Sequence, residues 1–394
     1  MISAIILGGA ALVLLGERIW KHWMVVRFFR RPVPAGDNVA LVSIVQPILS
    51  GDPTMPACLE QSLRARSRFA REFVWLVDDD DRLAQQICRD LINRYPDYAI
   101  NLMLMPPPGP RENPKMIKLL AGMQQARGDV LCVLDDDTQL PDCGLERCLP
   151  FLDQPGVGLA FGLPYYTSFG TLWSRMVAYF VNSHSLLTYV PYTMISEPMT
   201  INGMFYALRR TTYAAIGGFA GLEHTLADDF AVARRVREHG LRLAQTPLCH
   251  AISTTVTGPR HYLSLIQRWF IFPRESLLRH LRGRDLLVLY ALAMLPAFAP
   301  WLALGALVAW PSAWTVGFAL LYVGYDYAIF AHFNQKYLQH AAPWRYSWLV
   351  PLLQFTFPLQ LLAALLLPQR ITWRGHELQV ERGGTFRFVR RRSE

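Results

Sequence analysis

At 394 residues the chain is long enough for one large domain or two ordinary ones. Hydrophobic residues make up 52% of it and the mean hydropathy is +0.18, which is high for a wholly soluble protein. The net charge of +9 would suit nucleic acid, an anionic membrane or an anionic substrate. No nucleic-acid recognition motif accompanies it, so we expect no nucleic-acid partner. The cysteines contain no C-x-x-C pair, which argues against a zinc site.

The first apolar stretch, Met1–Gly16, is followed by Glu17 and then by a segment rich in basic residues up to Arg31. A secretory signal carries its positive charge before the apolar run, so this order favours a retained anchor helix. The positive-inside tendency places its N-terminus outside and residues 18–31 in the cytoplasm, beside lipid headgroups. We assign residues 1–31 to this anchor and its basic flank, with a buried globular helix as the alternative.

A second apolar region occupies residues 285–367. Leu286–Trp310 and Ala313–Phe333 are each long enough to span a bilayer, and the short break between them predicts an antiparallel hairpin with its turn outside. A third stretch contains Pro358. The positive-inside tendency favours a re-entrant or interfacial hairpin broken at this proline, which keeps the basic tail, 368–394, in the cytoplasm; a full third crossing is the alternative.

Between the two apolar regions, residues 32–258 alternate strand-like and helix-like patterns, as expected of an α/β domain with a mainly parallel sheet. Strands are expected over Val39–Val45, Glu72–Val77, Ile100–Met105 and Asp129–Leu134, and helices over Ala57–Arg66, Leu83–Tyr95 and Lys115–Ala126. No G-x-G-x-x-G or P-loop motif is present, which argues against the usual dinucleotide and ATP folds.

Two acidic runs follow strands of this sheet, Asp78–Asp81 and Asp135–Asp137. Functional groups of open α/β sheets gather at the carboxyl ends of strands. In a strand-end turn, the carboxylates of Asp135 and Asp137 can face one ligand, and two such groups suit Mg²⁺ or Mn²⁺. A solvated acidic turn is the simpler reading of this D-x-D spacing taken alone.

Two further segments carry candidate residues. Asp228 and Asp229 open a helical run, where they could serve as helix caps. Arg268 and Trp269 lie in the apolar and basic segment 259–284, which read alone is an interfacial helix with snorkelling arginines.

Taken together, these elements resemble the inverting glycosyltransferase family 2, and within it the ceramide glucosyltransferase-like group, from about Val39 to Trp269. The motifs match in order: Gln46-Pro47 with Gly51-Asp52-Pro53, Asp79 and Asp81, Asn113-Pro114-Lys115, Asp135-Asp136-Asp137, Asp228-Asp229, and Arg268-Trp269. Gln46 replaces the usual Lys, and Asp228 replaces Glu. Leu265 stands where the family has a polar residue, which puts a contact from this position in doubt.

The resemblance implies a GT-A-type (Rossmann-like) catalytic domain with a UDP-sugar donor and a Mn²⁺ or Mg²⁺ ion. Asp135 and Asp137 would hold the metal, and Asp229 would be the catalytic base. The donor would be contacted by Pro47, Asp79, Asp81, Lys115, Asp135, Arg268 and Trp269. Tyr165–Pro198, rich in aromatic residues, is the expected acceptor surface.

The sequence therefore predicts an integral membrane enzyme with a cytoplasmic catalytic domain, at a bacterial inner membrane. It would transfer glucose or N-acetylglucosamine with inversion to the hydroxyl of a lipid such as ceramide, in contact with the bilayer. A hopanoid or polyisoprenoid acceptor is one alternative, and a catalytically inactive membrane scaffold or lipid-binding protein is another from a different class. The sequence carries no signature of an oligomeric state.

Overall fold

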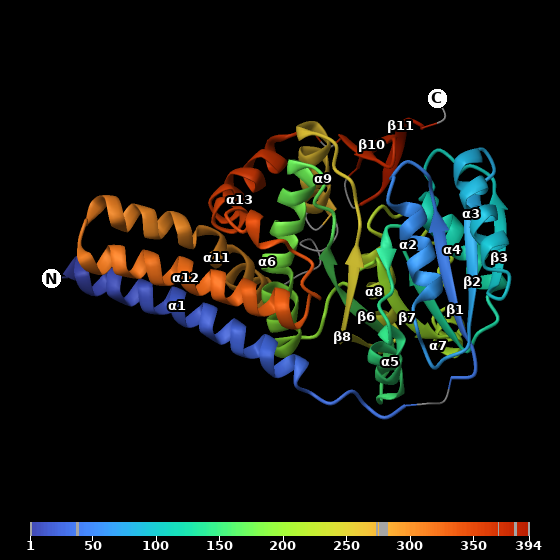
Figure 1. The fold of residues 1–394 in the computed structure, drawn as a ribbon, viewed down its shortest axis with the longest axis horizontal. Coiled ribbons are helices and arrows are strands. Elements are labelled where there is room, and N and C mark those ends of the chain that lie inside the picture. Colours follow the sequence, from blue (N-terminus) through green and yellow to red (C-terminus); the bar gives the residue numbers. More distant parts are fainter. Residues whose placement is uncertain are drawn as a thin grey trace.

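The computed structural model describes residues 2–36, 39–272, 275, 283–368, 370–381 and 384–392. Within them the chain forms an eight-stranded sheet flanked by helices, a small three-stranded sheet, and a group of long helices that projects to one side (Figure 1). The predicted α/β class is confirmed, and the sheet is the scaffold that positions the candidate site.

The large sheet has the strand order β3-β2-β1-β4-β7-β6-β8-β5. Its strands are β1 (Val42–Ile48), β2 (Arg71–Asp78), β3 (Ala99–Met105), β4 (Val130–Leu134), β5 (Thr138–Gln139), β6 (Val157–Tyr166), β7 (Phe205–Arg209) and β8 (Arg242–Ile252). The pairs β1–β2, β2–β3, β1–β4 and β6–β8 are parallel, whereas β7 runs antiparallel between β4 and β6. The four strands predicted from the sequence are therefore present as one parallel group.

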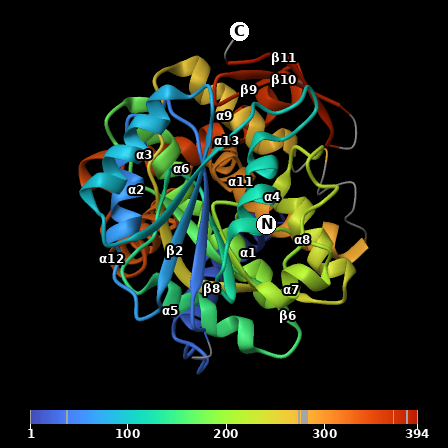
Figure 2. The ribbon, with the colours of Figure 1, turned by 90° about the vertical axis from the view of Figure 1, so that its right-hand side faces the viewer.

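Helices cover both faces of this sheet (Figure 2). One face packs against α2 (Met55–Arg64), α3 (Arg82–Arg94), α5 (Gly144–Cys148) and the 3₁₀ turn η1 (Leu149–Asp153). The other face carries α4 (Pro114–Gln125), α7 (Arg210–Ala215) and α8 (Asp228–Glu238). Burial on both faces explains why these strands read as nearly continuous apolar runs.

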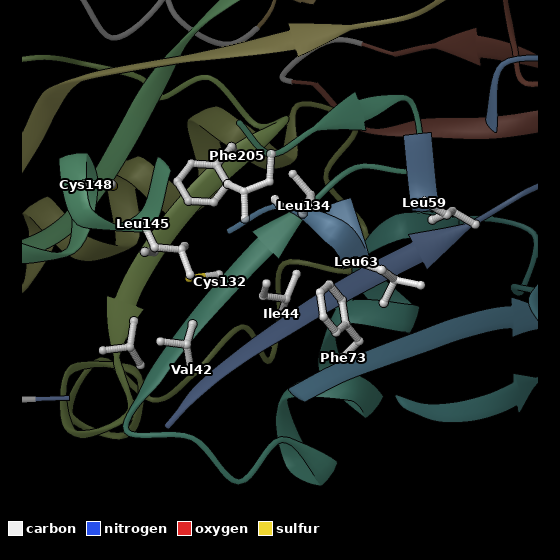
Figure 3. Close-up of a cluster of buried hydrophobic side chains, with 14 of the residues drawn as sticks. Val42, Ile44, Leu59, Leu63, Phe73, Cys132, Leu134, Leu145, Cys148 and Phe205 are labelled. Carbon is white, nitrogen blue, oxygen red and sulfur yellow. The ribbon is translucent and has the colours of Figure 1, made fainter. Parts of the chain in front are cut away.

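Side chains of β4 alternate between the two cores, as the pleat of a strand requires. Val130, Cys132 and Leu134 point into the cluster shown in Figure 3, together with residues of α2 and α5. Leu131 and Val133 point to the opposite cluster, against α4 and α8. This packing holds the end of β4, and the acidic residues that follow it, in a defined position.

The helices α1 (Ile2–Phe29), α11 (Gly283–Ala309) and α12 (Ala313–Lys336) lie side by side and form what we term the helical limb (Figure 1). Among the described residues, α12 is the one helix long and apolar enough to cross a membrane alone. In α11, the segments Gly283–Leu292 and Pro296–Ala309 are long enough only when counted as one span, and they meet at 50°. The predicted helical hairpin is present as α11 and α12.

Two basic residues of the limb are not where the sequence analysis placed them. Arg18 and Lys21 were expected beside lipid headgroups, but they are only 2% and 1% exposed. Arg18 pairs with Asp326 of α12, and Lys21 pairs with Glu17. Because buried charges must be paired, these contacts draw both side chains into the limb rather than towards its surface.

Three helices lie between the limb and the large sheet (Figure 1): α6 (Leu172–Ile195), α9 (Pro259–Phe272) and α13 (Leu349–Leu366), the last preceded by the 3₁₀ turn η3 (Trp344–Tyr346). Of these, α6 packs against both the limb and β6. The predicted break at Pro358 is wrong, because α13 runs through this proline. Its packing against α6, α9 and α11 supports the helix where the proline removes a backbone donor. The part of segment 259–284 that follows α9 lies outside the described residues, apart from Glu275 and the start of α11.

The predicted basic tail folds as an antiparallel sheet of β9 (Arg370–Trp373), β10 (His376–Val380) and β11 (Phe386–Arg390). Ile371, Leu378 and Phe386 bury one face of it against Leu226 and Ile271. These apolar contacts fold the segment against the α/β domain. The cytoplasmic placement of the tail stays a prediction.

Candidate active site

An acidic centre, Asp135–Asp137, lies at the carboxyl end of β4. Asp135 and Asp137 line a cavity of about 1330 Å³. Asp136 is buried, and it accepts a hydrogen bond from the backbone N–H of Leu49 (2.8 Å). The first and third carboxylates therefore share one cavity, as the D-x-D spacing predicts, while the middle one supports the turn after β1.

Lys115 joins two of the predicted motifs. Asn113 caps α4 by accepting hydrogen bonds at its start, and this cap positions the lysine in the first turn. Its Nζ lies 2.8 Å from Oδ1 of Asp135 and 3.1 Å from Oδ2 of Asp228, and it donates to the carbonyl of Gly203 (2.9 Å). Burial alone would lower the pKa of Lys115, but the two carboxylates hold it above its usual value.

Asp229 lies in the first turn of α8 and lines the same cavity. Burial, and after it the neighbouring Asp228, raises the pKa of Asp229 to about 7. A β-carbon added at Gly203 would lie 3.1 Å from the β-carbon of Asp229, so glycine at this position allows the close approach. A carboxyl that titrates near neutrality suits a general base.

The predicted donor contacts near β1 and β2 do not enter the large cavity. Asp79 is exposed. Asp81 caps α3 and accepts hydrogen bonds from the N–H (2.8 Å) and hydroxyl (2.7 Å) of Ser50. Pro47 lies on β1 and lines a separate cavity of about 80 Å³, which Lys115 also borders. Their roles toward the donor stay predictions.

The Arg-Trp motif of α9 forms part of the cavity wall. Arg268 and Trp269 both line it. The indole of Trp269 stacks on Phe180 with ring centroids 6.2 Å apart, and it meets Tyr166 edge to face at 6.1 Å. Both partners belong to the segment expected to form the acceptor surface, so the motif and this segment build one aromatic wall.

The unusual Leu265 is apolar lining in this wall, being 6% exposed. Gln267 does not take the place of the missing polar residue. Its side-chain N–H donates to the backbone carbonyl of Pro368 (2.6 Å), in the connection from α13 to β9. At position 265 the cavity wall is therefore apolar, where the family pattern has a polar residue.

Two arginines that the sequence analysis did not select reach the site from the C-terminal sheet. Arg374 lies in the turn between β9 and β10 with φ of 51°, and its Nη2 is 2.5 Å from Asp136 and 3.3 Å from Asp137. Arg392 donates to the carbonyl (2.6 Å) and hydroxyl (2.8 Å) oxygens of Ser50. In the sequence, Arg374-Gly375 indicates a turn. No sequence pattern near this pair indicates that Arg374 would contact Asp136 and Asp137, which lie more than two hundred residues earlier in the chain.

The cavity continues from the acidic centre to the base of the helical limb. At that end it is lined mainly by apolar residues of α11 and α13, including Leu289, Leu292, Pro296, Phe357 and Leu361. One cavity thus combines the carboxylates of the acidic centre with a mainly apolar lining where it meets the limb, to which Arg18 and Lys21 also contribute. This arrangement fits an amphiphilic molecule with its polar group at the acidic centre.

The acidic centre also offers ligands for a divalent cation. Among the described residues, no group of three or more His, Cys, Asp or Glu side chains is arranged to hold a metal. Mg²⁺ is commonly bound through one or two carboxylates with substrate phosphates completing its shell. The cavity-facing carboxylates of Asp135 and Asp137 supply this donor set, so the residues fit a metal that arrives with a nucleotide.

Comparison with known proteins agrees with this geometry. The sequence profile of glycosyl transferase family 21 matches residues 6–386, and the predicted ceramide glucosyltransferase-like resemblance is confirmed. A curated protein, the undecaprenyl-phosphate 4-deoxy-4-formamido-L-arabinose transferase of Pectobacterium atrosepticum, is 29% identical over 121 residues. That match covers 30% of this chain and 35% of the relative, so it spans about a third of the relative's length.

The fold is also found in a solved structure, the mannosyltransferase PcManGT from Pyrobaculum calidifontis in complex with GDP-Man and Mn²⁺. It superposes with a TM-score of 0.52 at 17% identity, over 92% of this chain and 97% of that one. At this identity the likeness concerns the fold alone, and the predicted GT-A-type architecture is confirmed.

Proposed function

The chain belongs to glycosyl transferase family 21, and from this premise we propose that it transfers a sugar from a UDP-sugar to the hydroxyl of a membrane lipid. The donor sugar would be glucose or N-acetylglucosamine, and a lipid such as ceramide would be the acceptor. The observation that carries the proposal is the single cavity that joins the acidic centre to the apolar base of the helical limb. A soluble acceptor would not require its hydrocarbon end.

Asp229 is suited to take the proton from the acceptor hydroxyl. The acceptor oxygen would then form a bond to the anomeric carbon as the bond from that carbon to the diphosphate breaks, which inverts the configuration. Asp135 and Asp137 would hold a divalent cation, which when bound offsets charge on the departing diphosphate. Arg268 and Trp269 would border the acceptor where the aromatic wall begins.

The lipid acceptor has support from two directions. The cavity wall combines aromatic residues of α6 and α9 with aliphatic residues of α11 and α13, which suits a lipid chain. The relative from Pectobacterium atrosepticum is named for an undecaprenyl-phosphate substrate, so a polyisoprenoid or hopanoid acceptor is the alternative to ceramide. We place the α/β domain in the cytoplasm at a bacterial inner membrane, with the helical limb in the bilayer.

We expect Arg374 to contact the diphosphate of the donor. Its guanidinium lies beside the acidic centre in the large cavity, and Arg groups bind phosphate oxygens strongly. Arg374→Ala should therefore weaken UDP binding by about 10- to 100-fold, as lost charge-assisted hydrogen bonds do. Isothermal titration calorimetry with UDP and Mn²⁺ would measure it.

The matched control for this variant is Arg390→Ala. Arg390 is exposed on β11, where it pairs with Glu377 at 2.8 Å, so its loss should leave UDP affinity unchanged. If Arg374→Ala bound UDP as tightly as the wild-type protein or more tightly, the proposed contact between Arg374 and the diphosphate would be contradicted. Arg374 would then be a counter-ion that neutralises the carboxylates in the absence of donor.

The proposed function is tested by measuring UDP release from the detergent-purified full chain. UDP-glucose and UDP-N-acetylglucosamine should be combined with ceramide, hopanoid and polyisoprenoid lipids, each with and without Mn²⁺. We expect release that needs one sugar, one lipid class and the metal, and mass spectrometry of the lipid should show an added hexose or N-acetylhexosamine. Folded protein that gives no lipid-stimulated release in any combination would favour the inactive scaffold instead.

A further inference from the structure

A polar cluster borders the cavity where it meets the helical limb. Arg18 of α1 is 2% exposed and is part of the cavity lining. Its Nε donates to the hydroxyl of Tyr322 (3.0 Å) and lies 3.3 Å from Oδ1 of Asp326, both on α12. Its Nη2 is buried and has no hydrogen-bond partner in the described part of the chain. An unpaired buried guanidinium nitrogen is costly, so it points to a partner within the cavity's occupant.

The charges of this cluster indicate what that partner is. Lys21 pairs with Glu17 (2.5 Å) and donates to the carbonyl of Leu292 (2.6 Å). Arg18 pairs with Asp326, so the cations and carboxylates balance. An added anion would be an uncompensated charge in an apolar surrounding. The missing partner of Nη2 is therefore better met by a neutral oxygen than by a phosphate or carboxylate.

His184 adds a second group at the same end. It lines the cavity, and its Nδ1 lies 2.9 Å from the carbonyl oxygen of Phe180. Burial, and after it the charge of Arg18, lowers the pKa of His184 to about 4, so the ring is neutral at physiological pH. The hydroxyl of Ser183 also lies 2.8 Å from Nδ1, and this hydroxyl donates its own proton to the carbonyl of Tyr179 (2.6 Å). Both neighbours of Nδ1 therefore act as acceptors, which places the imidazole proton on Nδ1 and leaves Nε2 as an acceptor.

The cluster is connected to the acidic end by the aromatic wall. Trp269 stacks on Phe180 at 6.2 Å, and Phe180 lies 5.4 Å from His184, one helical turn further along α6. Phe357 of α13 also stacks on Phe180, with ring centroids 5.4 Å apart. Asp229, His184 and Arg18 all line the same cavity as this wall, so a lipid that fills the cavity would contact both Asp229 and the polar cluster.

We propose that Arg18 and His184 form a second polar subsite, which binds a hydroxyl of the acceptor lipid other than the one that receives the sugar. Its oxygen accepts from Nη2 of Arg18, and its proton is donated to Nε2 of His184. This assigns the acceptor to lipids that carry at least two hydroxyl groups along the head of the molecule. The inference rests on the proposed function, because it takes the cavity as the acceptor site.

Lipids that differ by one hydroxyl test the subsite. The probes are 1-octadecanol, 1,2-octadecanediol and 1,12-octadecanediol, added to the detergent-purified full chain with UDP and Mn²⁺. Binding is read from the lipid-induced rise in Tm as a function of lipid concentration, and turnover is read from UDP release with the UDP-sugar. We expect the wild-type protein to bind one of the diols about tenfold more tightly than the mono-alcohol.

Arg18→Lys keeps a cation beside Asp326 but removes Nη2, the proposed donor to the second hydroxyl, so the preference for the diol should disappear. His184→Phe keeps an aromatic ring beside Phe180 and removes the acceptor, so it should reduce the preference several-fold even if the Arg18 variant folds poorly. Tyr322→Phe is the control. It removes the hydroxyl that accepts from Nε of Arg18, on a residue outside the cavity lining, and the preference should persist.

The outcomes separate the two proposals. Diol preference in the wild-type protein that survives both Arg18→Lys and His184→Phe would overturn the subsite, and so would equal binding of all three lipids. UDP release with equal KM for mono-alcohol and diols would overturn the subsite while supporting the transferase. Diol preference that depends on Arg18, without UDP release from any lipid, would support the subsite and contradict the proposed function.

Discussion

Asp229→Asn is expected to lower kcat by about 10²- to 10⁴-fold, the contribution of a positioned general base. The amide keeps the size of the side chain but cannot take the proton from the acceptor hydroxyl. The hydrogen bond that Oδ1 accepts from the N–H of Phe230 (2.7 Å) can be kept by the amide oxygen. UDP affinity, measured by calorimetry, should therefore stay close to that of the wild-type protein while UDP release falls.

The ionisation of Asp229 should also determine how activity falls at low pH. Burial and Asp228 raise the pKa of Asp229 to about 7, with Lys115 opposing and Asp135 adding to the shift. Tyr189 of α6 also faces it, and the phenol of this residue stays protonated because its own pKa is raised to about 12. The base must be ionised, so kcat/KM should rise about tenfold per pH unit up to pH about 7 and then level off.

Two results would contradict the role of Asp229. The control for Asp229→Asn is Asp90→Asn, a change to an exposed carboxylate of α3, and equal activity of the two variants would remove Asp229 from the mechanism. A wild-type profile that is flat between pH 5 and 8 would show that no group with this pKa limits the reaction, since a single base gives about a tenfold change per unit.

Asp135→Asn/Asp137→Asn should abolish metal-dependent nucleotide binding and lower kcat/KM by about 100- to 1000-fold. A bound metal contributes several kcal/mol of charge stabilisation, and each 1.4 kcal/mol is a factor of ten. The readout separate from activity is UDP binding by calorimetry with and without Mn²⁺. In the wild-type protein Mn²⁺ should strengthen UDP binding, and in the double variant it should have no effect.

Asp136→Asn is the matched control for this experiment, since the middle carboxylate does not line the large cavity. It accepts from Leu49 and pairs with Arg374, so its loss should lower Tm while Mn²⁺ still strengthens UDP binding. Unchanged lipid glycosylation by a folded Asp135→Asn/Asp137→Asn variant would contradict the metal site.

The sequence alone predicted those parts of the fold whose cause is local. Apolar runs bounded by turn residues gave the four parallel strands, and the acidic centre followed because Asp135–Asp137 comes directly after one of them. The bounds of β1 were shifted, Val42–Ile48 rather than Val39–Val45. Strand pairing explains the shift. β2 pairs with β1 as far as Ile48, whereas β4 pairs with β1 only over Val42–Val45. Pro47, which has no backbone N–H to donate, therefore lies beyond the end of the pairing with β4 and can remain in the strand.

Tertiary structure alone decided which distant residues meet at the site. Arg374 and Arg392 reach it because β9–β11 bury an apolar face against Leu226 and Ile271, and composition had marked this segment only as basic. Arg18 reached the other end of the cavity because Asp326, far along the chain, offered a buried counter-charge. Local patterns in the sequence determined the strands, helices and carboxylates, which depend on neighbouring residues. The positions of the three arginines depend on packing and charge pairing between segments hundreds of residues apart. These interactions exist only in the folded chain.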